Sequence, residues 1–440
     1  MAARSPASRQ EELKVPIPIT ELAEKLMTGE VTVEEQNPFF PPGDFAEVAD
    51  GIGFVAAMAN SSVFKTDDGL VMVDTGSPFS ARAIHGKVRS WVGDSVRLDT
   101  AIFSHGHIDH VFGVGPFEED AEKSGWATPK VVAHEAMPAR FDRYKLTAGW
   151  NGAINRRQFS VPGLEWPTEY RYPDETYRDT HTVEVGGIEF ELHHCRGETD
   201  DHTWTWVPSR KALCTGDLII WCSPNAGNPQ KVQRYPREWA IGLREMAALE
   251  PEMLLPGHGM PVFGAEHCQV ILLDTAELLE FIHDETVSLM NEGARLDEII
   301  HSVKVPEALI EKPYLRPVYD DPEFIVRNVY RLYGGWYDGN PANLKPAPDA
   351  AVAAEVALLA GGVAALIDRA LALADQGELR LAGHLAEMAT LAEPENRDAH
   401  AARASVNAKR VAHETALMSK GVFGAASRES DARARELGED

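Results

Sequence analysis

Cysteine and long hydrophobic runs are both scarce in this sequence of 440 residues. Its four cysteines show no Cys-x-x-Cys spacing, and so few thiols in so long a chain do not make a disulfide framework. No segment approaches the roughly 18 to 20 uninterrupted apolar residues that cross a bilayer, and the first residues hold no apolar core of a signal peptide. These absences predict a cytoplasmic protein with reduced thiols and without a membrane partner.

Positive charge is also in short supply. The 42 Lys and Arg residues face 68 Asp and Glu residues, which gives a formal net charge of -26. Such a surface repels phosphate backbones, so nucleic acid is not an expected partner. The hydrophobic content of 44% is that of an ordinary folded chain. Because single cores stop growing near about 250 to 300 residues, we expect two or more domains.

Four metal-binding side chains lie within six residues, directly after the short apolar segment 100–103. His105 and His107 are two apart, so in extended backbone they project to the same side and can hold one ion. Asp109 and His110 follow where the chain turns, and from there they can face a second ion. Unrelated surface histidines are the alternative, but the tight spacing and the apolar flank favour a metal site.

Short β segments precede and follow this motif, and helical segments separate some of them. The expected strands are 45–49, 52–55, 61–65, 70–74, 100–103, 130–134, 182–185, 188–194, 203–207, 212–217 and 252–258. Two similar β-rich halves predict two sheets packed face to face, with helices outside and the site along one edge. Residues 138–175 show no clear period, which favours a long irregular lid or substrate loop.

Beyond about residue 265 the pattern is helical. Runs with a 3.6-residue period cover roughly 268–292, 296–303, 322–333, 349–375, 377–392 and 395–419. Breaks such as Gly361-Gly362 predict antiparallel helix hairpins. The expected division is an N-terminal extension (1–44), a catalytic domain (45–265), a helical domain (266–425) and a polar tail (426–440).

Three further ligand candidates stand at expected strand ends beside a glycine, namely Glu198, Asp217 and His258. Together with the motif they supply enough side chains for two ions. Three histidines near Glu198 could replace it as a ligand or orient it from the second layer, and these are His193, His194 and His202. The strand register favours Glu198 over these histidines.

The chain resembles the metallo-β-lactamase-fold hydrolases, whose His-x-His-x-Asp-His motif is matched by residues 105–110. Their third motif ordinarily reads Pro-Gly-His-Thr, whereas residues 196–199 read Arg-Gly-Glu-Thr, with the glutamate of the alkyl sulfatase branch. Residues 333–346 look like the signature of the alkyl sulfatase dimerisation domain. The resemblance implies an α/β fold, a metallo-β-lactamase αββα sandwich followed by an all-α helical-hairpin domain, and a homodimer through that second domain.

The same resemblance implies two zinc ions per chain and no other cofactor. One zinc would take His105, His107 and Glu198, and the other Asp109, His110 and His258, with Asp217 bridging. The ions would activate a bridging water for attack on a sulfate monoester, a small anionic ester, with Asp109 and Asp217 as the catalytic carboxylates. Alkyl sulfatases usually carry a second glutamate where Asp217 stands, which is a departure from the branch.

Separate cations are expected to hold the sulfate. Two Zn²⁺ give +4, and three carboxylates with a bridging hydroxide give -4, so the metal core is close to neutral. The candidates are Arg156, Arg157 and Arg234, with Asn155 beside the first two. A guanidinium donates a planar fork to sulfate. The adjacent pair could equally lie solvated on the surface.

Two other functions stay open. A hydrolase of the same fold could act on a lactone, a thioester or a carboxylic ester, and such an enzyme would tolerate loss of the arginines. An interaction protein could bind a partner through its helical repeats and keep only a vestigial metal site. All the ligand positions hold competent residue types, which favours an enzyme.

Overall fold

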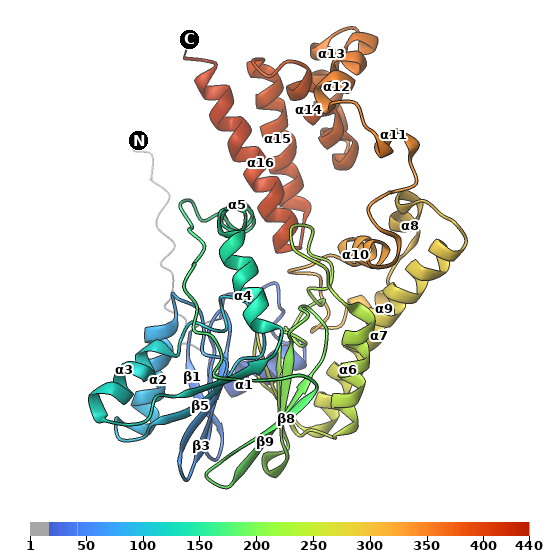
Figure 1. Cartoon of the computed structure of the whole chain (residues 1–440). Coiled ribbons are helices and arrows are strands. Elements are labelled where there is room, and N and C mark those ends of the chain that lie inside the picture. The colour runs from blue at the N-terminus through green and yellow to red at the C-terminus, as the bar shows by residue number, and fades with distance from the viewer. Residues whose placement is uncertain (1–16, 42, 440) are drawn as a thin grey trace, which may run out of the picture.

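The computed structural model describes residues 17–41 and 43–439, and within them the strands form two mixed sheets. The first sixteen residues of the predicted N-terminal extension lie outside the described residues. The two sheets lie face to face in the lower half of the molecule, and a helical half rises above them (Figure 1). The predicted order of an α/β sandwich followed by a helical domain is confirmed.

The first sheet has seven strands in sequence order. They are β1 (Phe45–Ala49), β2 (Ile52–Val55), β3 (Ser61–Thr66), β4 (Gly69–Val73), β5 (Leu98–Ile102), β6 (Lys130–His134) and β7 (Glu175–Tyr177). Strands β1 to β4 form an antiparallel meander, whereas β4, β5, β6 and β7 run parallel. The metal-type motif therefore leaves the carboxyl end of a central parallel strand, β5.

The second sheet has six strands in the order β13-β12-β11-β10-β9-β8. They are β8 (Thr180–Val185), β9 (Ile188–His194), β10 (Thr203–Val207), β11 (Ala212–Gly216), β12 (Met253–Pro256) and β13 (Val262–Phe263), with a short 3-10 turn at Pro208–Arg210. Strands β11 and β12 are parallel and the other pairs are antiparallel. The loops after β9, β11 and β12 carry the other three predicted ligands.

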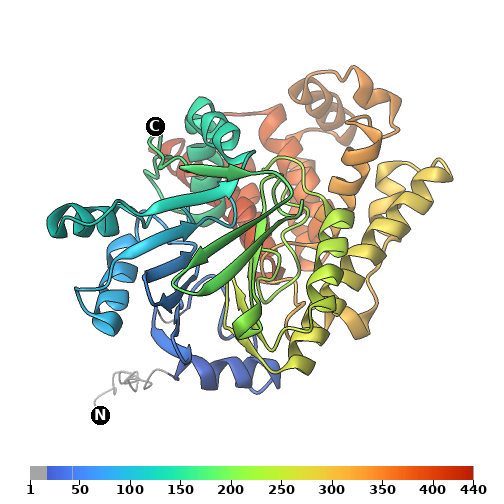
Figure 2. The ribbon, with the colours of Figure 1, turned by 60° about the horizontal axis from the view of Figure 1, so that its bottom comes forward.

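Both faces of the central strand β4 are buried, which explains why this strand reads as a continuous apolar run. In β4, Val71 and Val73 join the core between the sheets, whereas Leu70 and Met72 join the core on the outer face. The outer face is covered by α2 (Ala81–Val92) and α3 (Gly115–Ser124), and α6 (Pro236–Ala248) and α7 (Ala265–Asn291) cover the second sheet (Figure 2). Helix α1 (Ile19–Met27) buries its apolar face in the central core, so part of the predicted extension belongs to the sandwich.

The prediction of one irregular segment over 138–175 is wrong for its first half. Residues 137–159 form two helices, α4 (Met137–Leu146) and α5 (Ala148–Phe159). Helix α4 buries Met137, Arg140, Phe141 and Tyr144, which have the i, i+3, i+4, i+7 spacing of one helix face. The helical period escaped detection because a charged residue, Arg140, lies on the buried face.

The upper half is helical, as predicted. Its helices are α8 (Leu296–Ser302), α9 (Glu307–Ile310), α10 (Pro322–Gly334), α11 (Pro341–Leu344), α12 (Asp349–Ala360), α13 (Val363–Asp375), α14 (Leu379–Ala392), α15 (Arg397–His413) and α16 (Leu417–Glu436). Asp321 and Asn396 cap α10 and α15 by accepting backbone N–H groups. Residues 426–436, predicted to be part of a polar tail, instead continue α16.

Helix α16 joins the two halves of the molecule because it packs along α5 (Figure 1). Arg428 Nη2 donates to Ser160 Oγ at 2.9 Å, just beyond the end of α5. A Cβ on Gly421 would stand 2.1 Å from the Gln158 carbonyl oxygen, so the two helix backbones approach closely there.

In the described part of the chain, no single helix is long and apolar enough to cross a membrane. Helices α12 and α13 meet that test only as a pair, and they are bent by 88° at Gly361-Gly362.

The close contact of α5 with α16 leads to a stability prediction. Gly421→Ala is expected to destabilise the protein by about 1 to 3 kcal/mol, because the new methyl group overlaps a backbone carbonyl that cannot rotate away. Gly424→Ala is the matched control in the same helix, since its Cβ would meet the flexible end of Arg428 at 3.2 Å and Val411 Cγ2 at an ordinary contact distance of 3.8 Å. Thermal unfolding checks both variants, and equal midpoints would contradict the close packing.

Candidate metal centre

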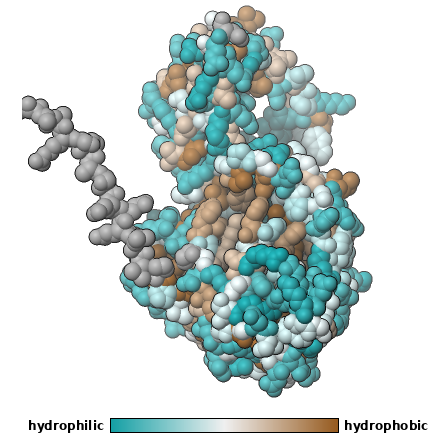
Figure 3. All heavy atoms as spheres, turned by 90° about the vertical axis from the view of Figure 1, so that its left-hand side faces the viewer, coloured by the Kyte–Doolittle hydropathy of each residue, from teal (hydrophilic) through white to brown (hydrophobic). Residues whose placement is uncertain are grey.

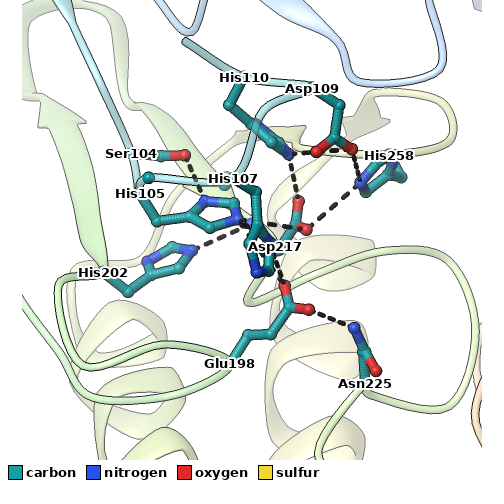
Figure 4. Close-up of polar contacts among 12 residues, drawn as sticks. Ser104, His105, His107, Asp109, His110, Glu198, His202, Asp217, Asn225 and His258 are labelled. Carbon is teal, nitrogen blue, oxygen red and sulfur yellow. Dashed lines mark hydrogen bonds and ion pairs between the residues drawn. The ribbon is translucent and has the colours of Figure 1, made fainter. Parts of the chain in front are cut away.

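Seven ligand-type side chains converge at the edge of the two sheets nearest the helical half (Figure 4). They form two groups whose ligand atoms lie within 4.8 Å of one another, namely His105, His107, Glu198 and Asp217, and Asp109, His110 and His258. The loops after β5, β9, β11 and β12 deliver them. The structure thus brings together the seven residues to which the resemblance assigned a ligand role, and Asp217, expected to bridge the ions, falls in the group of His105, His107 and Glu198.

Asp217 lies between the two groups. Its Oδ1 atom is 3.3 Å from His110 Nε2, and its Oδ2 atom is 3.3 Å from His258 Nε2 and 3.6 Å from His105 Nε2. One carboxylate therefore faces both groups, as a residue shared by two ions must.

Glu198 turns one oxygen toward the ligand cluster and the other away from it. Its Oε2 atom is 3.8 Å from His105 Nε2 and 3.7 Å from His107 Nδ1. Its Oε1 atom accepts a hydrogen bond from Asn225 Nδ2 and lies 2.9 Å from Arg234 Nη1. These two partners fix the carboxylate so that a single oxygen points at the histidines.

The chemistry of this cluster fits metal cations. Among the described residues, Glu198 Oε2, Asp217 Oδ1 and His110 Nε2 are buried and have no hydrogen-bond partner, although buried polar atoms ordinarily have one. Burial lowers the pKa of His105 and of His107 well below the usual value, so both imidazoles are neutral, which is the form that binds a metal. Burial raises the pKa of Glu198 well above its usual value, and a cation would reverse that effect.

A second layer holds the motif in place. Asp74, at a φ of 57° after β4, accepts hydrogen bonds from the Ser104 backbone N–H and side-chain hydroxyl, and lies 2.7 Å from His110 Nδ1. Asp201 accepts from the Gly106 N–H at 3.0 Å and is paired with the buried Arg140. These carboxylates set the direction of the ligands above them.

The three histidines near Glu198 have different surroundings in the structure. His193 stacks on Trp204 and His194 stacks on His134, so both face away from the ligand cluster. His202 is buried, stacks on His105 with ring centres 4.9 Å apart, and accepts the backbone N–H of Asp217 at 3.1 Å. None of them replaces Glu198 in the cluster, and His202 instead supports its neighbours.

A cavity of about 390 Å³ opens onto the ligand cluster. Figure 3 shows a hollow with hydrophobic walls where the helical half meets the sheet half. The apolar lining residues are Phe39, Phe40, Met58, Phe79, Ile108, Phe159, Val161, Leu164, Trp166 and Ile220. The cavity therefore has a polar, ligand-lined end and an apolar body.

The predicted substrate-binding residues divide into two pairs. Asn155 and Arg234 are buried and line the cavity. Arg156 is exposed and donates to the Leu164 carbonyl oxygen at 2.6 Å, and Arg157 donates to Gln230 at 2.8 Å. The structure does not bring Arg156 and Arg157 into the cavity, because α5 turns the face bearing Asn155 toward the cavity and Arg156 toward solvent.

Sequence reasoning missed several residues of the site. Lys231 and Tyr319 line the cavity, Asn225 holds Glu198, and Asp74 supports His110. The Asp-Thr-Gly segment after β4 was a usable signal for Asp74, because it ends a strand beside the motif. Lys231 lies in an irregular loop with no pattern to distinguish it.

Comparison with known proteins gives matches over both halves of the chain. The family model for the metallo-beta-lactamase superfamily matches residues 55–258, and that for alkyl sulfatase dimerisation matches residues 295–432. A linear primary-alkylsulfatase of Pseudomonas sp. (strain ATCC 19151) is 28% identical over 324 residues, which are 68% of this chain and 60% of the relative. An (R)-specific secondary-alkylsulfatase of Pseudomonas sp is 28% identical over 374 residues, which are 79% of this chain and 56% of the relative.

A solved structure of the stereoselective inverting sec-alkylsulfatase Pisa1 from Pseudomonas sp. superposes with a TM-score of 0.78 at 25% identity, covering 87% of this chain and 65% of that one. Fold and ligand cluster together define a metallo-β-lactamase-fold protein. Within that superfamily the chain is similar to the alkylsulfatases, and its residues 295–432 match the model of the alkyl sulfatase dimerisation domain. The chain spans only 56% to 60% of the length of the two curated relatives.

The support of His110 by Asp74 leads to a prediction about metal affinity. Asp74→Asn removes the negative charge behind His110 and is expected to weaken the binding of added Zn²⁺ to this cluster by about 10- to 100-fold. Titration against a chromophoric chelator measures that affinity. Asp68→Asn is the control, because Asp68 is an exposed residue of the same β-rich half. Equal affinities in the two variants would refute the role of Asp74.

Proposed function

We propose that this chain is a dinuclear zinc hydrolase that cleaves a sulfate monoester with an apolar alcohol portion. The proposal depends on one observation: metal-type ligands, cationic side chains and hydrophobic walls all line the same cavity. An amphiphilic anionic ester matches those three features. The names of the curated relatives, both alkylsulfatases, support the same substrate class.

The ligand assignment follows the two groups in the cluster. His105, His107 and Glu198 would hold one zinc, Asp109, His110 and His258 the other, and Asp217 would serve both. Zinc bound there supplies Lewis acidity and lowers the pKa of water toward 7.

The side chains around the reacting centre have distinct tasks in this proposal. Asp109 and Asp217 line the cavity, so their carboxylates can orient an attacking water by accepting its hydrogen bonds. Asn155 and Arg234 border the same polar end and would contact the sulfate. The apolar walls enclose the alcohol portion and exclude bulk water, which strengthens the electrostatic contacts at the polar end.

The two alternative functions, a neutral-ester hydrolase and an interaction protein, explain the site less well. A neutral lactone, thioester or carboxylic ester would not need cations at the polar end of the cavity. An interaction protein with a vestigial site would not need two groups of ligand-type side chains, seven residues in all, with ligand atoms within 4.8 Å of one another in each group. We retain the neutral ester as the alternative substrate class.

Three further features belong to the proposal. The sheet sandwich (45–265) acts as the catalytic domain, and the helical domain (266–425) makes a homodimer. Two adjacent leucines at the end of α12 support such an interface, since Leu358 is 74% and Leu359 is 86% exposed. A reducing, cytoplasmic location is supported by the four cysteines, which are free and buried.

Sulfate release tests the proposed activity. Purified, zinc-loaded protein is expected to release inorganic sulfate from alkyl sulfates of short or long chain, and His107→Ala is expected to abolish the release, because it removes a ligand. Ion chromatography of free sulfate is the measurement. Turnover of carboxylic esters or lactones without any sulfate release, with two metals bound, would replace the sulfate ester by the alternative substrate class.

The leucine pair tests the dimer. The double variant Leu358→Glu and Leu359→Glu is expected to shift the mass in solution from two chains to one, because it places charge in an apolar interface. Light scattering after gel filtration gives the mass. Leu146→Glu is the control, since Leu146 is 85% exposed but lies on α4 of the other domain. A single-chain mass for the unchanged protein would reject the dimer.

A further inference from the structure

Two cationic side chains, Lys231 and Arg234, border the cavity near the ligand cluster. Arg234 is 2% exposed, its Nη1 atom lies 2.9 Å from Glu198 Oε1, and it also donates to the Glu198 carbonyl oxygen. The charge of Arg234 is therefore matched by a carboxylate of the protein itself, and its position is set by that partner.

Lys231 is placed differently. Its Nζ atom donates to Asn155 Oδ1 at 3.3 Å, and it lies 5.3 Å from the centre of the Trp166 ring. Within the described residues, no carboxylate oxygen stands at ion-pairing distance from this ammonium group. A half-buried cation without a counter-ion is costly, and a bound anion would remove that cost.

Asn155 fixes the direction of the ammonium group. Asn155 is buried and its Nδ2 atom donates to the Asn151 carbonyl oxygen at 2.8 Å, which leaves Oδ1 facing Lys231. An ammonium group has three N–H donors, so two remain for a ligand in the cavity. The Trp166 ring adds a favourable cation–π contact on the side of the apolar wall.

We propose that Lys231 is the residue that binds the anionic head group of the substrate and thereby selects anionic esters over neutral ones. The inference rests on the proposed function for the substrate class. It adds to that function a lysine of the 225–234 loop as the residue that distinguishes an anionic from a neutral ester, whereas Arg234 borders the sulfate with its charge already matched by Glu198. Lysine is suited to this task because a compact point charge binds a tetrahedral oxyanion in more than one orientation.

The titration behaviour of Lys231 agrees with this geometry. Burial lowers the pKa of Lys231 to about 8, Arg234 acts in the same direction, and Asp109 and Glu198 oppose both. A bound anion favours the charged amine. Sulfate affinity is therefore expected to fall as the pH rises through about 8, and this fall should be smaller in Lys231→Arg, whose guanidinium stays protonated.

Calorimetric titration of zinc-loaded protein with inorganic sulfate tests the proposal. Lys231→Met is expected to weaken sulfate binding about 10- to 100-fold, the loss of a hydrogen bond to a charged group, and Lys231→Arg to restore most of it. Lys211→Met is the matched control, since Lys211 is an exposed lysine paired with Glu252. The zinc content and the thermal midpoint establish that each variant is folded and loaded with metal. If Lys231→Met fails either check, Lys231→Gln takes its place.

The outcomes separate this inference from the proposed function. Unchanged sulfate affinity in a folded, loaded Lys231→Met or Lys231→Gln variant overturns the role of Lys231. In alkyl sulfate turnover, the role of Lys231 also requires a raised KM in Lys231→Met, with little change in the hydrolysis of a neutral ester. If the unchanged protein binds sulfate through Lys231 but releases none from alkyl sulfates, the proposed function fails and the anion site stands.

Discussion

Three carboxylates, those of the half-buried Asp109 and of the buried Glu198 and Asp217, lie close together, and their mutual repulsion is the constraint on which the rest of the site depends. Burying carboxylates side by side is expensive unless cations lie among them. Arg234 Nη1 forms an ion pair with Glu198 Oε1 at 2.9 Å, and His110 Nε2 lies 3.3 Å from Asp217 Oδ1. Among the described residues, Glu198 Oε2, Asp217 Oδ1 and His110 Nε2 still make no hydrogen bond, so the arrangement calls for metal cations.

Because the ligands come from distant parts of the chain, their convergence depends on the sheet edge and on the layer beneath it. Strands β5, β9, β11 and β12 end at the same edge, and each passes into a loop that carries ligands. Beneath them, Asp74 holds Ser104 and His110, and the Arg140–Asp201 pair holds the backbone at Gly106. A Cβ at Gly106 would lie 2.6 Å from the Arg140 side chain, so a larger residue there would push the motif off this support.

The helical half contributes to the cavity as well as to the proposed dimer. Tyr319 lines the cavity, and the first residues of α16 donate backbone hydrogen bonds to Val318 and Tyr319. Gln158, on the cavity side of α5, donates to the Tyr319 hydroxyl at 3.0 Å, while the backbone of the same residue packs against Gly421 of α16. The cavity is thus shared by both halves, so a shift of α16 would move one of its walls.

The sequence by itself determined the ligand types, the strands that present them and the helical second half, because those signals are local. The direction of the side chains from His105 to His110, and of those at the glycine-flanked strand ends, depends on the backbone geometry of only a few neighbouring residues. Only the tertiary structure decided which cations face the cavity. Arg156 looked like an anion ligand and faces solvent, whereas Lys231 carried no signal and lines the cavity. The reason is physical: the direction of a long charged side chain is set by packing between distant segments, which a local pattern does not encode.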